Sequence, residues 1–84
     1  MIESYVDLNS VEKVRKFSSI ARSCPFNVYL VSDSRRVNAA SLLGIFSLNL
    51  IKPIKVEADS NDFTSVRRRI GEFLVSKMIT SNYR

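Results

Sequence analysis

The sequence contains no histidine among its 84 residues, and it has only one cysteine, two glycines and two prolines. Without histidine, and with a single cysteine, zinc sites of the usual kind are excluded. The single cysteine also excludes a disulfide within the chain, which fits a reducing compartment. Two isolated glycines leave no glycine-rich phosphate loop. Because no run of eighteen apolar residues occurs, we expect no membrane span.

The usual elements of a catalytic site are missing as well. No two carboxylates are placed for acid–base work, and no imidazole can serve as a base. We therefore predict that the protein is not an enzyme and uses no metal or cofactor. The length indicates a single domain over residues 1–84. The acidic, alternating residues 1–7 are unlike a signal peptide, so we expect a cytoplasmic protein.

Positive charge is in excess, with 13 lysines and arginines against 8 acidic residues and a net charge of +5. This balance favours solubility and acidic partners. Arg67, Arg68 and Arg69 form a basic run that is typical of a solvated helix face. The alternative hypothesis is a small nucleic-acid-binding domain that uses the basic residues of the first and last helices. No aromatic residue interleaves with these arginines, so we rank nucleic acid below a protein partner.

The spacing of apolar residues predicts the secondary structure of the first half of the chain. Residues 1–7 alternate apolar and polar side chains, which is the pattern of a half-buried strand. A helix follows as far as Ser23, with Asn9 as N-cap in a capping box with Glu12, or with Ser10 as the rival cap. Beyond Pro25, residues 26–32 and 35–39 predict two strands joined by a tight turn. The buried face of the first helix is predicted to hold Val11, Val14, Phe17 and Ala21.

The second half predicts two more helices and one more strand. Residues 42–48 indicate a helix of about two turns, capped by Ser41. Residues 54–59 alternate as a strand, and a long last helix is expected from Phe63 to Met78, with residues 81–84 frayed beyond it. Cys24, on the apolar side of the first helix, is expected to be a buried, inert thiol. The element order β-α-β-β-α-β-α predicts an α+β open sandwich.

The stretch 37–48, V-N-A-A-S-L-L-G-I-F-S-L, suggests a function. Leu42, Ile45 and Leu48 share one side of the predicted helix, whereas Leu43 and Phe46 share another. A helix this short cannot bury apolar residues all round. We therefore expect part of the Leu42, Leu43 and Phe46 cluster to be exposed as a contact surface. The alternative is that the whole cluster is core, because periodicity alone does not assign burial.

This stretch resembles the HPr phosphocarrier family of the bacterial sugar phosphotransferase system, which reads roughly V-N-x-K-S-I-M-G-V-M-S-L there. The direct matches are Val37, Asn38, Ser41, Gly44, Ser47 and Leu48. Four further positions match by type, and a weaker resemblance covers nearly the whole chain. It implies an HPr-like open-faced sandwich, with a four-stranded antiparallel sheet of order 1-4-2-3 covered on one face by three helices.

The resemblance fails at the position that carries the chemistry of the family. Counted back from Ser41, the phosphorylated histidine falls on Ser10, and Glu12 replaces the phosphate-binding arginine. A serine hydroxyl needs a base to become a nucleophile, and its phosphate ester is stable. We therefore predict that the protein does not relay phosphate. A phosphocarrier that acts through Ser10 ranks last among our hypotheses.

Ser41 matches the regulatory serine of the family, so the resemblance makes it a candidate for phosphorylation. A plain N-cap explains the same residue equally well, and Ala40 replaces the lysine that usually precedes it. Our leading hypothesis is an HPr-like regulatory or protein-interaction module that lacks the relay. Its predicted partner-binding residues are Leu42, Leu43 and Phe46, flanked by Ser10 and Lys13.

Overall fold

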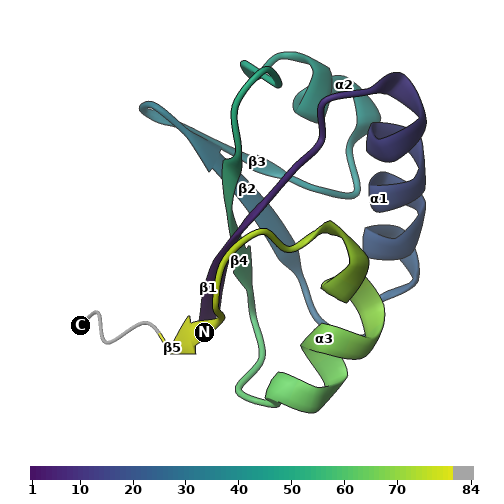
Figure 1. Ribbon diagram of the computed structural model, residues 1–84. Coiled ribbons are helices and arrows are strands. Elements are labelled where there is room, and N and C mark those ends of the chain that lie inside the picture. The colour runs from purple at the N-terminus through teal and green to yellow at the C-terminus, as the bar shows by residue number, and fades with distance from the viewer. Residues whose placement is uncertain (81–84) are drawn as a thin grey trace.

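The computed structural model describes residues 1–80, so the predicted fraying of residues 81–84 lies outside the described residues. Three α-helices cover one face of an antiparallel sheet (Figure 1). The elements are β1 (Ile2–Val6), α1 (Val11–Ser23), β2 (Val28–Ser32), β3 (Arg35–Asn38), α2 (Leu42–Phe46), β4 (Ile54–Ala58), α3 (Phe63–Ile70), the 3-10 turn η1 (Gly71–Phe73) and β5 (Ile79–Thr80).

The sheet has five strands in the order β3-β2-β4-β1-β5, and every pairing is antiparallel. The α+β class, with three helices on one face of an antiparallel sheet, is confirmed, but the predicted four-stranded sheet of order 1-4-2-3 is wrong. The difference is β5, which pairs with Ile2 and Glu3 and so covers the outer edge of β1. β1 is therefore an inner strand, with neighbours on both sides.

The core lies between the sheet and the helices. Every second residue of β1, β2 and β4 points toward the helices, and most of these side chains are apolar. Burying one large apolar side chain contributes about 1.5–3 kcal/mol. The rings of Phe17 and Phe73 meet edge to face with centroids 5.1 Å apart, which joins α1 to η1. The largest fully buried side chains include Ile2, Leu8, Phe17, Leu30, Ile45, Ile54 and Ile70.

The start of α1 decides between the two predicted caps. The hydroxyl of Ser10 accepts a hydrogen bond from the amide of Lys13 at 3.1 Å, so Ser10 is the N-cap. The prediction of Asn9 as cap is wrong, because the Asn9 side chain instead accepts from the ammonium of Lys13 at 3.2 Å. Val11, predicted to be buried, is 59% exposed. It occupies the first turn of α1, next to α2 and outside the packed face.

The predicted long last helix is also wrong, because α3 ends at Ile70. After η1 the chain becomes extended, and residues 74–80, which we call the C-terminal strap, run beside β1 (Figure 1). Leu74 and Met78 still pack against the core, as they would have done from a helix. The chain leaves the helix because the edge of β1 would otherwise have unpaired backbone groups, and the extended strap pairs with them. For example, the amide of Val75 donates to the carbonyl of Tyr5 at 2.9 Å.

The pairing of the strap with β1 is interrupted by a bulge. Leu74 pairs with Val6 and Ile79 pairs with Glu3, so the strap uses two residues more than β1 between the same two points. Beside this interruption the hydroxyl of Ser76 takes the place of a backbone carbonyl and accepts from the amide of Tyr5 at 3.0 Å. A side chain thus completes the ladder where the register changes.

Candidate docking site beside the N-terminus of α1

α2 is held in one orientation by its cap and by close packing on β3. The hydroxyl of Ser41 accepts from the amide of Gly44 at 3.1 Å. A Cβ at Gly44 would lie 3.3 Å from the Cβ of Val37, so glycine lets the helix approach the strand this closely. Ile45 is fully buried, and Leu48 is 8% exposed. One side of α2 is therefore committed to the core.

The other side of α2 faces outward. Leu43 is 83% exposed and Phe46 is 40% exposed, while Leu42 is half-buried against the core. Phe46 also lines a shallow groove of about 290 Å³, which the start of α1 and the chain after α2 complete. The groove is lined by Leu8, Asn9, Ser10, Val11, Phe46, Leu50 and Ile51. Its lining is mostly apolar, with Ser10 and Asn9 as its polar members.

Two apolar residues that the sequence did not single out as contact residues belong to this surface. Val11 and Ile51 both line the groove, and Ile51 is 88% exposed. We call the exposed set Val11, Leu43, Phe46 and Ile51 the α2 patch. No charged residue occurs between positions 37 and 51. That absence of charge was a sequence signal that could have extended the predicted surface to Ile51.

Ser10 and Lys13, predicted to flank the contact, are placed differently from one another. Ser10 is exposed and lines the groove beside Phe46. Lys13 does not line it, because its ammonium turns toward Asp7, with 3.3 Å to the carboxylate, and toward Asn9. Lys13 instead lines a neighbouring charged groove together with Asp7, Glu12 and Glu72. The structure therefore brings Ser10, but not Lys13, to the α2 patch.

The surroundings of Ser10 do not activate it. Its hydroxyl oxygen accepts the capping hydrogen bond from Lys13, and no carboxylate in residues 1–80 is hydrogen-bonded to it. A serine nucleophile needs an adjacent base to remove its proton. Residues 1–80 also contain no cluster of three or more side chains that could hold a metal ion. Chemically, the site offers an apolar contact surface beside a capped helix terminus.

Ser41 lies exposed at the start of α2, close to an arginine that sequence analysis missed. The guanidinium of Arg22 donates to the carbonyl of Ala40 at 3.4 Å and to the hydroxyl of Ser18 at 3.1 Å. Arg22 therefore lies next to the residue that precedes Ser41. No sequence pattern indicates this contact, because Arg22 and Ala40 meet only when α1 and β3 pack on the same core.

Cys24 follows α1 and is half-buried rather than fully buried. Burial raises the pKa of its thiol above the ordinary value, and the positive charge of Arg69 partly offsets this rise. The guanidinium of Arg69 lies at the same end of α1, where it donates to the carbonyl of Ser23 at 3.3 Å. A raised pKa keeps the thiol neutral, in line with the predicted inert cysteine.

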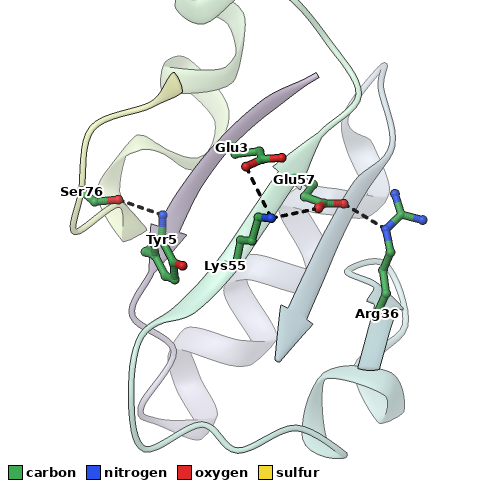
Figure 2. A network of polar contacts seen from close by, with 6 residues as sticks. All are labelled: Glu3, Tyr5, Arg36, Lys55, Glu57 and Ser76. Carbon is green, nitrogen blue, oxygen red and sulfur yellow. Dashed lines mark hydrogen bonds and ion pairs between the residues drawn. The ribbon is translucent and has the colours of Figure 1, made fainter. Parts of the chain in front are cut away.

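The sheet face opposite the helices carries a chain of alternating charges (Figure 2). The ammonium of Lys55 lies 3.4 Å from Glu3 and 3.6 Å from Glu57, whose other oxygen lies 2.9 Å from Arg36. The Arg36 guanidinium also lies 3.8 Å above the ring of Tyr29. Glu3 and Glu57 are direct cross-strand partners, so Lys55 offsets the repulsion of two like charges. With Tyr29 included, this network connects four strands, β1, β2, β3 and β4.

Comparison with known proteins identifies the fold. No protein-family model matches the chain, and no curated protein matches it in sequence. Among solved structures, the chain is similar to HPr-C-His from Thermoanaerobacter tengcongensis, with a TM-score of 0.71 and 18% sequence identity. The match covers 87% of this chain and 91% of that chain. The protein therefore has an HPr-like fold. No helix in residues 1–80 has the length and apolar character needed to cross a membrane.

Proposed function

We propose that this protein is a non-catalytic, HPr-like regulatory module of a phosphotransferase-related system that binds another protein through the α2 patch. The observation that carries the proposal is the exposure of Leu43 and Phe46, 83% and 40%, on a helix whose opposite side is buried. Exposed apolar clusters on small proteins mark contact sites. The single free cysteine fits a cytoplasmic location, which is part of the same proposal.

The role we propose excludes the phosphate relay. The sequence has no histidine, and the position that corresponds to the histidine of the family is a helix cap without a neighbouring base. Purified protein incubated with enzyme I and phosphoenolpyruvate should remain unlabelled. An acid-labile phosphate on the protein would refute this part of the proposal. Acid-stable label on Ser10 would instead support the phosphocarrier hypothesis that we rank last.

The docking surface can be tested with paired variants. In a pull-down from its own cells, Leu43→Ser together with Phe46→Ser should abolish capture of the partner, because the centre of an interface depends on a few large apolar side chains. Val75→Ser is the matched control, since Val75 is 53% exposed on the strap, away from the α2 patch. Equal capture by both variants would place the contact on another surface. Circular dichroism should show that both variants are folded.

Phosphorylation of Ser41 would regulate the same surface. The hydroxyl is exposed at a helix N-terminus, where added negative charge is favoured, and Arg22 lies beside the preceding carbonyl. A phosphate on Ser41 would add negative charge at the N-terminus of α2, next to the exposed side of the helix that carries Leu43. Mass spectrometry after incubation with an HPr kinase tests this proposal. Unmodified Ser41 would leave the residue as a structural cap.

A further inference from the structure

The net charge of the protein lies in one part of the fold. Residues 11–23 and 63–73 contain seven of the thirteen basic residues and two of the eight acidic ones. They therefore account for the whole net charge of +5, while the remaining residues hold six charges of each sign. These two segments are α1 and α3 with η1, which lie on the same side of the sheet (Figure 1).

Contacts join the two segments into one basic helix layer. The guanidinium of Arg69 reaches the carbonyl of Ser23 at 3.3 Å, and Lys16 pairs with Glu72 at 2.9 Å. Arg15, Arg67 and Arg68 are exposed, and none of them forms an ion pair within the described residues. These unpaired guanidinium groups leave the layer open to an anionic partner.

The composition of the layer distinguishes between two kinds of anionic partner. A protein interface normally has an apolar centre inside a polar rim. Here the exposed side of α1 beyond its first turn carries Arg15, Lys16, Ser19 and Arg22, and the one large apolar side chain exposed on α3 is Phe63, its first residue. Contacts to a phosphate backbone need cationic and polar groups and no apolar centre. The layer therefore matches a phosphate backbone better than a protein.

We propose that the basic helix layer binds the phosphodiester backbone of nucleic acid without reading its sequence. Phe63, 37% exposed at the start of α3, is the one exposed aromatic side chain among the described residues of the layer, and a single ring does not provide the series of platforms on which successive bases stack. Binding is therefore electrostatic and insensitive to base composition. This function is separate from the α2 patch and does not rest on the docking proposal.

The test is fluorescence anisotropy with a labelled DNA duplex of random sequence, titrated between about 50 and 200 mM salt. We expect binding at the lowest salt and a linear fall of log K with log salt, because each contacted phosphate releases counterions. Arg15→Gln together with Arg68→Gln should weaken binding at low salt by at least about tenfold and reduce the slope by about two. Glutamine preserves helix propensity, so both helices should remain.

The matched control is Arg35→Gln together with Lys52→Gln, which removes the same charge from exposed residues outside the layer. Binding by this control should stay within about twofold of the parent protein. Equal weakening by both double variants would show attraction to net charge alone and overturn the proposal. No binding at low salt, or tighter binding of a polyglutamate competitor than of the duplex, would overturn it as well. The Leu43→Ser, Phe46→Ser variant should bind the duplex normally, which separates this test from that of the docking site.

Discussion

The hydroxyl groups of Ser4 and Ser76 lie 3.0 Å apart, although the two residues are 72 positions apart in the chain. Ser4 also donates to the carbonyl of Ser76 at 2.9 Å. Figure 2 shows the second contact of Ser76, whose hydroxyl accepts from the amide of Tyr5. Two serines therefore connect the first strand to the strap at the point where the backbone pairing is interrupted.

Replacing Ser76 with alanine should loosen the strap. The Tyr5 amide loses its acceptor, and the expected loss in the free energy of unfolding is about 1 kcal/mol. Urea unfolding measures this loss, and amide exchange at Tyr5 should become faster. Ser19→Ala is the control, because Ser19 is exposed on α1 and makes no side-chain hydrogen bond within residues 1–80. An unchanged exchange rate at Tyr5 would show that water replaces the hydroxyl without cost.

The two glycines should respond to alanine with opposite signs. At Gly44 a Cβ would lie 3.2 Å from the Ser41 hydroxyl oxygen and 3.3 Å from the Val37 Cβ, so Gly44→Ala should destabilise the protein by about 1 kcal/mol. Gly71 has helical angles, and its nearest neighbour is the movable Arg67 side chain. Gly71→Ala should therefore stabilise by about 0.5–1 kcal/mol. Thermal unfolding of both variants checks the signs; a stabilising Gly44→Ala would mean that α2 can move off β3.

The charged network should tolerate the loss of one carboxylate better than the loss of the other. Glu57 contacts both Arg36 and Lys55, whereas one carboxylate oxygen of Glu3 is buried without a partner. Glu57→Gln should therefore cost about 1–2 kcal/mol. Glu3→Gln should be nearly neutral, because it also removes repulsion between facing carboxylates. Unfolding in urea compares the two variants, and a larger loss for Glu3→Gln would contradict this ranking.

Cys24 should react slowly with iodoacetamide at about pH 8, because burial raises its pKa and less thiolate is present. Arg69→Gln removes the charge that lowers this pKa, so alkylation should slow further. Arg68→Gln, on the exposed side of α3, should leave the rate unchanged. Folding disfavours the thiolate, so the free energy of unfolding should fall as the pH rises above about 8.5. Faster alkylation of Arg69→Gln would show that Arg69 mainly shields the thiol.

Much of the sheet and two of the helices could be predicted from residue spacing alone. The alternation in β1 and β4 and the apolar face of α1 each describe one element with one buried side. The C-terminal region could not be predicted in this way. Leu74 and Met78 fit a helical spacing, yet they reach the same core from an extended strap. The deciding factor was the free edge of β1, which is a property of the assembled sheet.

Only part of the candidate site could be predicted from the sequence, because the rest also depends on how distant segments pack together. The spacing within residues 42–48 separates Leu43 and Phe46 from Ile45, and the burial of these residues follows that separation. Val11 was wrongly predicted to be buried, because it fits the apolar spacing of α1. It lies in the first turn of the helix, which does not pack on the core at this position. Ile51 was missed because it lies in a loop without periodicity. Both residues join the groove through packing between segments that are distant in sequence.

The position of β1 has a consequence for how the chain is made. Ile2 pairs with Ala58 on one side and with Thr80 on the other, so both neighbours of the first strand are synthesised long after it. Such distant pairings slow folding, because large loops must close before they are formed. As the polypeptide leaves the ribosome, β1 therefore stays unpaired until β4 emerges, and its outer edge stays free until the strap emerges. A nascent chain arrested before the strap should consequently depend on chaperones to keep that free edge from aggregating.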